Sequence, residues 1–223
     1  MGFLYAILDV LFPVHCVGCN SRSSYLCDKC LSDCPEAERE SAKWIFPLYD
    51  YRHPPVKKAV WILKYKGRRA VAGIFGEILY GRILEELADL RIMENFRRAL
   101  LIPIPLSRAR TRERGYNQAE LICRKIVELD QANLRHGADA SLTLEKNALV
   151  KIKNTEHQAR IENRSIRLKN IVGSFAVKNP ERVAGRNIIL IDDVTTTGAT
   201  LSEAKKVLKN AGAKKVIAFT VAH

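Results

Sequence analysis

The clearest structural signal in the chain is Asn187-Ile188-Ile189-Leu190-Ile191-Asp192-Asp193-Val194-Thr195-Thr196-Thr197-Gly198-Ala199-Thr200, an apolar run ending in two carboxylates and a hydroxyl-rich turn. Residues 188–191 are unbroken aliphatics, typical of a strand buried on both faces of a parallel sheet. The turn then lies at the carboxyl end of the strand, where open α/β sheets bind ligands. Residues 201–208 have a helical pattern, and the amide groups of such a helix start can enclose a phosphate. The segment therefore predicts a site for a ribose and a phosphate.

The same segment resembles the phosphoribosyl pyrophosphate (PRPP) motif of type I phosphoribosyltransferases, in which two acids after four apolar residues precede Thr-Thr-Gly-Ala-Thr. The resemblance implies that Asp192 and Asp193 are the catalytic pair and hold the ribose 2- and 3-hydroxyls, directly or with magnesium. It also implies that residues 196–200 bind the 5-phosphate. The PRPP-binding residues expected here are Asp192, Asp193, Thr195, Thr196, Thr197, Gly198, Ala199 and Thr200.

The alternative for this segment is an ordinary buried strand followed by a capped helix, in which Asp193 and Thr195 only satisfy backbone groups. A cap requires neither two adjacent acids nor a Thr-Thr-Gly-x-Thr loop, so the spacing favours a ligand site. A Walker-type nucleotide site is excluded, because Gly-x-x-x-x-Gly-Lys-Thr/Ser occurs nowhere in the chain.

The length of 223 residues and the 47% content of hydrophobic residues predict a globular protein of one large domain with a small appendage. We place an amino-terminal helix and a cysteine module at residues 1–40, and the large domain at 41–223 with a hood segment at 41–95. No segment approaches the ~20 uninterrupted apolar residues of a spanning helix, and Asp9 makes the start a poor secretory signal. The expected location is the cytoplasm, with peripheral attachment to the inner face of the membrane left open.

The net charge of +13 and the pI of about 9.6 produce a field that favours polyanions, so nucleic acid is a plausible partner. The basic residues cluster in two stretches, 108–114 and 151–169, which flank the expected site loops. The candidate nucleic-acid contacts are Arg108, Arg110, Arg112, Lys151, Lys153, Arg164, Arg167 and Lys169. Solvated surface charge is the alternative for both stretches.

Four cysteines form two Cys-x-x-Cys pairs, Cys16 with Cys19 and Cys27 with Cys30. Two such pairs can place four thiolates around one structural zinc ion. Disulfides are the main alternative, and they are disfavoured because nothing indicates export. Cys34 and His15 are near enough in sequence to substitute as ligands, and Cys123 is expected in the core.

The remaining pattern alternates strands and helices, which predicts an α/β fold with a parallel sheet and right-handed crossovers. Apolar residues at 3, 4, 7, 8, 11 and 12 predict a first helix that packs on the core, with a partner or membrane surface as the alternative. Helices are expected at 56–64, 74–90, 118–129 and 201–208, and an Arg-rich loop after residue 107. Strands are expected at 44–51, 99–102, 148–152, 173–177, 188–191 and 216–221.

Three further segments resemble the ComF/GntX family of phosphoribosyltransferase-like proteins. The first is Pro-x-Pro-Leu-Ser at 103–107 followed by Arg-Gly-Tyr-Asn-Gln at 114–118. The second is the pair of cysteine motifs with Leu-Cys-Asp-Lys-Cys-Leu at 26–31, and the third is Leu-Lys-Tyr-Lys-Gly at 63–67. Together with the PRPP motif they follow the family order over nearly the whole chain. The resemblance implies a type I phosphoribosyltransferase-like sheet flanked by helices, with a small amino-terminal zinc module.

The family resemblance also implies a role in DNA uptake and natural transformation, with a DNA-uptake helicase as a partner. Further PRPP contacts are expected from Leu106, Ser107, Arg108 and Arg114, where an arginine can give a forked pair of donors to pyrophosphate. Asn117 and Gln118 could complete that shell, or the segment could only shape a helix start. Residues 151–170 resemble the family's segment over the PRPP site, with a plain surface helix as the alternative. Lys64 and Lys66 are either hood contacts or solvated lysines.

Two functions of different classes remain. The first is a ComF-like DNA-uptake protein that binds PRPP or a related ribose phosphate together with single-stranded DNA, with Tyr116, Tyr65 or Trp61 available for stacking. The second is a metabolic phosphoribosyltransferase that transfers phosphoribosyl from PRPP to a free base or another small acceptor and releases pyrophosphate. The family pattern favours the first. No motif marks an acid or base, so the sequence leaves turnover open.

Overall fold

The structure is a computed structural model that describes residues 13–22, 24–38, 42–94, 96, 98–134, 142–153 and 171–223. Its centre is a five-stranded sheet in the order β1-β7-β6-β2-β3, with every neighbouring pair parallel. The strands are β1 (Ile45–Tyr49), β2 (Leu100–Pro103), β3 (Thr143–Leu144), β6 (Asn187–Val194) and β7 (Lys215–Ala222). The predicted parallel sheet is therefore confirmed.

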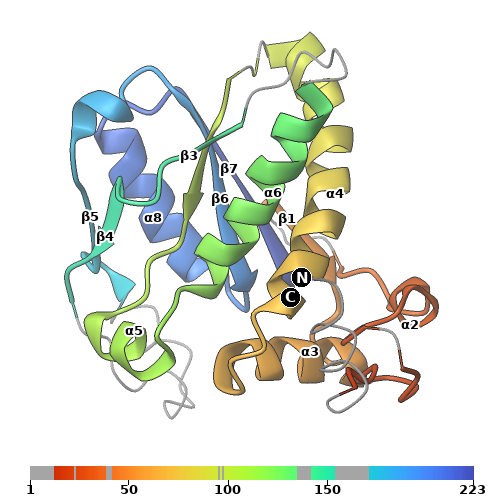
Figure 1. The fold of residues 1–223 in the computed structure, drawn as a ribbon. Helices are drawn as coiled ribbons and strands as arrows, with labels where there is room; N and C mark the ends of the chain where they lie inside the picture. Colours follow the sequence, from red (N-terminus) through yellow and green to blue (C-terminus); the bar gives the residue numbers. More distant parts are fainter. Residues whose placement is uncertain are drawn as a thin grey trace.

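Helices cover both faces of this sheet (Figure 1). The long helices α4 (Ala70–Glu94) and α6 (Gln118–Leu134) pack together over one face, and α8 (Ala199–Asn210) covers the other. Alternate residues of β6 divide between the two layers, because Ile189 and Ile191 join the cluster beneath α4 and α6, whereas Ile188 and Leu190 join the cluster beneath α8. This double burial explains why β6 is apolar at every position up to its acidic end.

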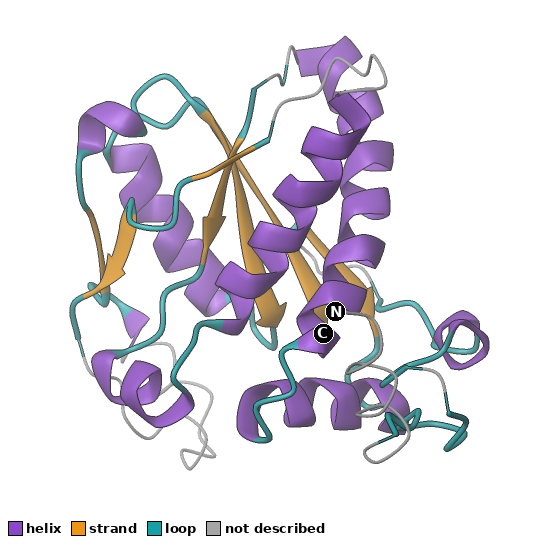
Figure 2. Ribbon diagram, in the orientation of Figure 1, coloured by secondary structure: helices purple, strands orange, loops and turns teal. Residues whose placement is uncertain are grey.

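The two expected strands at 148–152 and 173–177 exist but do not enter the central sheet. β4 (Leu149–Lys151) and β5 (Phe175–Val177) pair antiparallel with each other in a separate two-stranded sheet. Phe175 and Leu149 are both buried in the cluster beneath α8, so this small sheet packs against that side of the molecule (Figure 2). The expectation of one parallel sheet was wrong for this pair, because an apolar pattern identifies a strand but not its neighbour.

The Arg-rich stretch expected as a loop is a short helix, α5 (Arg108–Arg114). The Ser107 hydroxyl accepts a hydrogen bond from the Arg110 amide at 3.3 Å and caps the helix start. Gly115 ends the helix in the left-handed conformation, with φ of 74°. The serine and glycine on either side of the arginines were the sequence signals for this helix.

The amino-terminal part of the described chain packs beside α3 (Pro54–Tyr65), with the short helix α2 (Asp28–Ser32) within it. Cys16 and Leu26 are buried in the same cluster as Leu63 of α3, so the cysteine segment shares a core with the larger domain. The first helix expected at 1–12 lies outside the described residues. Among the helices that the structure describes, none has the length and apolar character needed to cross a membrane.

Candidate functional site

The two acidic residues of the deciding segment lie at the carboxyl end of β6, next to the central strands β2 and β7. Asp193 is buried and Asp192 is half-buried. Burial, together with the neighbouring Asp193 carboxylate, raises the pKa of Asp192 to about 7, and the charges of Lys64 and Lys151 act in the opposite direction. A carboxyl group with this pKa can lose its proton near neutral pH when a metal ion or a hydroxyl donor approaches it.

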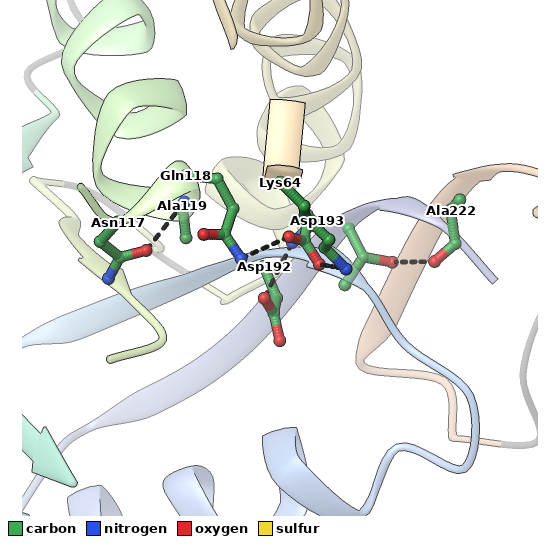
Figure 3. Close-up of polar contacts among 8 residues, drawn as sticks. Lys64, Asn117, Gln118, Ala119, Asp192, Asp193 and Ala222 are labelled. Atoms are coloured by element: carbon green, nitrogen blue, oxygen red, sulfur yellow. Dashed lines mark hydrogen bonds and ion pairs between the residues drawn. The ribbon is translucent and has the colours of Figure 1, made fainter. Parts of the chain in front are cut away.

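Asp193 is held by two side chains from distant parts of the chain (Figure 3). Lys64, at the end of α3, places Nζ 2.8 Å from Oδ1, and Gln118, at the start of α6, donates from Nε2 to Oδ2 at 2.6 Å. Burial acts to lower the pKa of Lys64, but the Asp193 carboxylate outweighs it and the pKa is raised. Both oxygens of Asp193 therefore have a protein partner, and the hood helix is connected directly to the acidic strand end.

A small cavity of about 50 Å³ lies in the turn between β6 and α8, lined by Asp192, Val194 and residues 195–201. The turn is anchored to the end of β7, since the Thr195 amide donates to the Ala222 carbonyl at 2.9 Å. The His223 ring nitrogen Nε2 lies 3.0 Å from the Thr196 carbonyl. Gly198 has φ of 66° and precedes α8, so the first amides of that helix face the cavity region. A cavity at a helix start offers backbone amides and hydroxyl groups that can donate hydrogen bonds to an anion.

The residues of the loop after β2 that were expected to bind PRPP differ in their exposure. Ser107 is buried and its hydroxyl caps α5, while Leu106 is half-buried and Arg108 is exposed. Arg114 lies over the ring of Tyr65, with Cζ 5.0 Å from the ring centroid. Its Nε and Nη1 atoms are buried and have no hydrogen-bond partner among the described residues. Buried guanidinium donors without a partner can bind an anionic ligand.

In the Gly-Tyr-Asn-Gln segment that follows α5, two side chains make structural contacts and one contacts the acidic strand end. Asn117 accepts from the Ala119 amide and donates to the Ile104 carbonyl, both at 3.0 Å, so its amide is used locally. The Tyr116 hydroxyl donates to the Leu63 carbonyl and ties the segment to α3. Only Gln118 reaches the acidic strand end, which the sequence did not reveal because 75 positions separate it from Asp193.

The basic candidates on β4 and α5 surround the same strand end from the other side. Burial, followed by the charge of Arg110, lowers the pKa of Lys151, and Asp192 counteracts this. Lys153 is exposed and its Nζ donates to the Val172 carbonyl at 3.1 Å, while Arg112 is exposed on α5. Three candidates, Arg164, Arg167 and Lys169, lie outside the described residues.

The four cysteines of the two Cys-x-x-Cys pairs form one cluster. The Sγ atoms of Cys16, Cys19, Cys27 and Cys30 all lie within 4.8 Å of one another, and all four residues are free thiols. Four sulfurs on a tetrahedral zinc ion, each at about 2.3 Å, lie about 3.8 Å apart, so the cluster has the dimensions of a metal site. A disulfide would instead require about 2.05 Å.

The surroundings of the cluster show which neighbours take part in it. Hydrogen bonding with Ser21 lowers the pKa of Cys19 to about 6, whereas burial and the other thiols raise the pKa of Cys30 to about 12. Unequal pKa values among close thiols are expected at a site where a metal ion would replace the thiol protons. Gly18 is required by space, because a Cβ there would lie 2.7 Å from the Cys30 Sγ. Cys34 lies outside the cluster and its Sγ donates to the Cys30 carbonyl at 3.0 Å.

Comparison with known proteins agrees with this geometry. Residues 140–223 match the phosphoribosyl transferase domain family. The chain is 27% identical over 190 residues to the DNA utilization protein YhgH of Shigella flexneri, covering 85% of this chain and 74% of the relative. It is 27% identical over 210 residues to competence protein F of Haemophilus influenzae, covering 92% and 82%. It is 37% identical over 123 residues to competence protein ComFC of Bacillus subtilis, covering 55% and 43%.

The helix-flanked parallel sheet, with two acids at a central strand end and a domain match over that region, defines a protein with a phosphoribosyltransferase fold. The relatives and the four-cysteine cluster narrow the assignment further. The chain is similar to the competence proteins F and ComFC and to the DNA utilization protein YhgH, so the resemblance inferred from its sequence motifs is confirmed.

Proposed function

We propose that this protein is a ComF-like DNA-uptake protein that acts in natural transformation and binds PRPP, or a related ribose phosphate, together with single-stranded DNA. The observation that carries the proposal is the strand end itself, where two carboxylates, a phosphate-sized cavity and unpaired guanidinium donors lie together. The role in DNA uptake is supported by relatives named competence protein F, competence protein ComFC and DNA utilization protein.

In the proposed complex the 5-phosphate occupies the cavity of the β6–α8 turn, where hydroxyl and amide groups of residues 195–200 can donate to its oxygens. Asp192 and Asp193 accept hydrogen bonds from the ribose hydroxyls, and their carboxylates would also hold Mg²⁺, which would supply positive charge to the bound phosphates. Arg114 meets the pyrophosphate with its unpaired donors. The ribose competes with Lys64 for Asp193, so binding of the sugar loosens the contact between α3 and the strand end.

The four cysteines hold a structural zinc ion in this proposal. Their thiolates form a closed set of four sulfur ligands, which is the donor set of structural rather than catalytic zinc sites. If the ribose site turns over, the reaction is displacement of pyrophosphate from the anomeric carbon. Positive charge near the pyrophosphate would then stabilise the leaving group.

The ribose site is tested by calorimetry with PRPP and Mg²⁺, using Asp192→Asn and Asp193→Asn. Each amide loses the charge that attracts the ion, so we expect the affinity to fall about tenfold or more, with the larger loss in the presence of Mg²⁺. Asp89→Asn, an exposed acid on α4, is the control and should bind as the unaltered protein does.

Wild-type affinity in the Asp192→Asn/Asp193→Asn double variant would show that the segment is only a structural turn. Release of pyrophosphate on addition of a free base, without any binding of single-stranded DNA, would replace this proposal with the metabolic transferase.

A further inference from the structure

A second cationic surface lies on the side of α3 away from the acidic strand end. Here the cysteine segment and α3 enclose a groove of about 490 Å³. Four basic residues contribute to its lining, and none of the lining residues is acidic: His15, Lys58, Lys66 and Arg68. This groove is separate from the small cavity of the β6–α8 turn, whose lining residues are all different.

The interior of the groove is less polar than its rim. Three of its lining residues, Val17, Tyr25 and Ile62, pack against the main core cluster and offer an apolar surface. A cationic rim around an apolar and aromatic floor is suited to a nucleotide, which carries a flat base and a phosphate. An acidic peptide would match the charge but would leave this floor without a planar partner.

Two exposed aromatic rings continue the surface along α3. Trp61 is 45% exposed and Tyr65 is 55% exposed, which is unusual for residues of this size, and their ring centroids are 6.1 Å apart. The Lys66 ammonium, which also lines the groove, lies 5.2 Å from the centre of the Trp61 ring. Each exposed ring therefore has a cation beside it, because Arg114 lies over Tyr65.

Together, the groove and the two exposed rings extend from the cysteine segment towards the expected ribose site. Figure 1 shows α3 between the cysteine segment with α2 on one side and α5 on the other. Tyr65 contacts Arg114 of α5, and Lys64, one position earlier, pairs with Asp193. A strand that starts in the groove and crosses Trp61 and Tyr65 therefore arrives beside the acidic strand end.

We propose that single-stranded nucleic acid binds along α3, with one nucleotide in the groove between the cysteine segment and α3 and with bases stacked on Trp61 and Tyr65. Lys58, Lys66 and Arg68 contact its phosphates. The inference rests on the nucleic-acid part of the proposed function and is independent of PRPP binding. It adds a surface that is distinct from the basic stretches of α5 and β4.

The chain contains two tryptophans, which gives a direct measurement of stacking. Trp44 is half-buried under Lys205, whose Nζ lies 4.0 Å from the ring centroid, so it serves as the internal reference. Oligo(dT) should quench the fluorescence of a Trp44→Phe variant, which retains Trp61, and should leave that of a Trp61→Phe variant nearly unchanged. Trp61→Ala should weaken binding about tenfold, because one stacked base is lost.

The phosphate contacts are tested by the salt dependence of oligo(dT) binding. Lys58→Gln combined with Lys66→Gln should flatten the slope of log affinity against log salt by about 1.4 units, since each phosphate contact on a single strand contributes about 0.7. Lys57→Gln is the matched control, because Lys57 is exposed on the same helix, carries the same charge and does not line the groove. The slope measured for Lys57→Gln should change by less than half of the contribution of one phosphate contact.

The outcomes distinguish a failure of this inference alone from a failure of the nucleic-acid part of the proposed function. If the unaltered protein binds oligo(dT), but Trp61→Ala and the double lysine variant bind equally well, the groove is not the binding surface and DNA binding itself stands. If the unaltered protein binds no oligo(dT) at low salt, both ideas fail. Equal binding of a blunt duplex would also overturn stacking, because paired bases are not available to Trp61 and Tyr65. Parallel titration with oligo(rU) determines whether the strand is DNA or RNA.

Discussion

At the scale of single residues, the most consequential finding is that a buried carboxylate of the expected ribose site is already neutralised within the protein. Asp193 has only 4% of its side chain exposed, and Lys64 is paired with it at 2.8 Å. Removing one partner of a buried pair leaves the other charge without compensation, and this is more costly than removing both. The pair is therefore structural in the free protein, and under the proposed function Lys64 would compete with a ribose for Asp193.

We expect Lys64→Met to lower the free energy of unfolding by about 3 kcal/mol, because it leaves the Asp193 carboxylate buried and unpaired. The Lys64→Met/Asp193→Asn double variant should recover much of that loss, as chemical denaturation of all four proteins in the cycle would show. Lys57→Met, exposed on the same helix, should change stability by less than about 0.5 kcal/mol. Strictly additive effects of the two substitutions would contradict a direct pair.

At the scale of elements, the cysteine segment has little regular structure. Its only helix among the described residues is the five-residue α2, which contains no buried residue. The segment contributes Cys16 and Leu26 to the main core and forms one wall of the groove on α3. Because the segment has little regular structure, a metal ion bound by the four thiolates would add to the stability that its packing on the core provides.

We expect the purified, reduced protein to contain about one zinc ion per chain, and Cys27→Ser combined with Cys30→Ser to reduce this to near zero. Removal of zinc should lower the melting temperature and make the chain near residues 16–30 sensitive to proteolysis. Elemental analysis with limited proteolysis measures both effects. Cys34→Ala is the control, because the Cys34 sulfur lies outside the cluster, and it should retain its zinc. Free thiols without metal in the unaltered protein would refute the assignment.

At the scale of the whole molecule, basic side chains from three separate elements lie near the acidic strand end. α5 and β4 bring Arg110 and Lys151 to one side of the acidic strand end, and α3 brings Lys64 to the other. A phosphate group that approached the strand end would find the Asp193 carboxylate already paired with Lys64. This distribution of charge suits a long polyanion that extends past the site better than a small anion that is bound entirely within it.

We expect binding of single-stranded DNA to be largely independent of sequence and to weaken steeply as salt rises, because phosphate contacts release counterions. Arg110→Gln combined with Arg112→Gln should flatten the salt slope by about 1.4 units if both side chains contact phosphates. Lys178→Gln combined with Lys206→Gln, two exposed lysines outside these stretches, provides a control with the same change of net charge. Filter binding at several salt concentrations gives the slopes, and equal slopes for the two double variants would exclude α5 from the contact surface.

Local sequence patterns were sufficient to predict the features of this protein that depend on residues close together in the chain. The acidic strand end with its turn, the two Cys-x-x-Cys pairs and most helices and strands follow from periodicity and spacing, and the sheet confirms the predicted α/β class. Short-range signals were overlooked at α5, where Ser107 and Gly115 mark both ends of a helix, and the short elements α2 and β3 were not predicted either. These features form through contacts within a few residues, which is why a sequence can reveal them.

Contacts between distant segments required the folded chain. The partners of Asp193 come from α3 and α6, and no pattern near residue 193 identifies Lys64 or Gln118. The same is true of the antiparallel pairing of β4 with β5, and of the groove that α3 forms with the cysteine segment. Each depends on how helices and strands pack in three dimensions, because burial and pairing energies act between surfaces that the order of residues does not bring together.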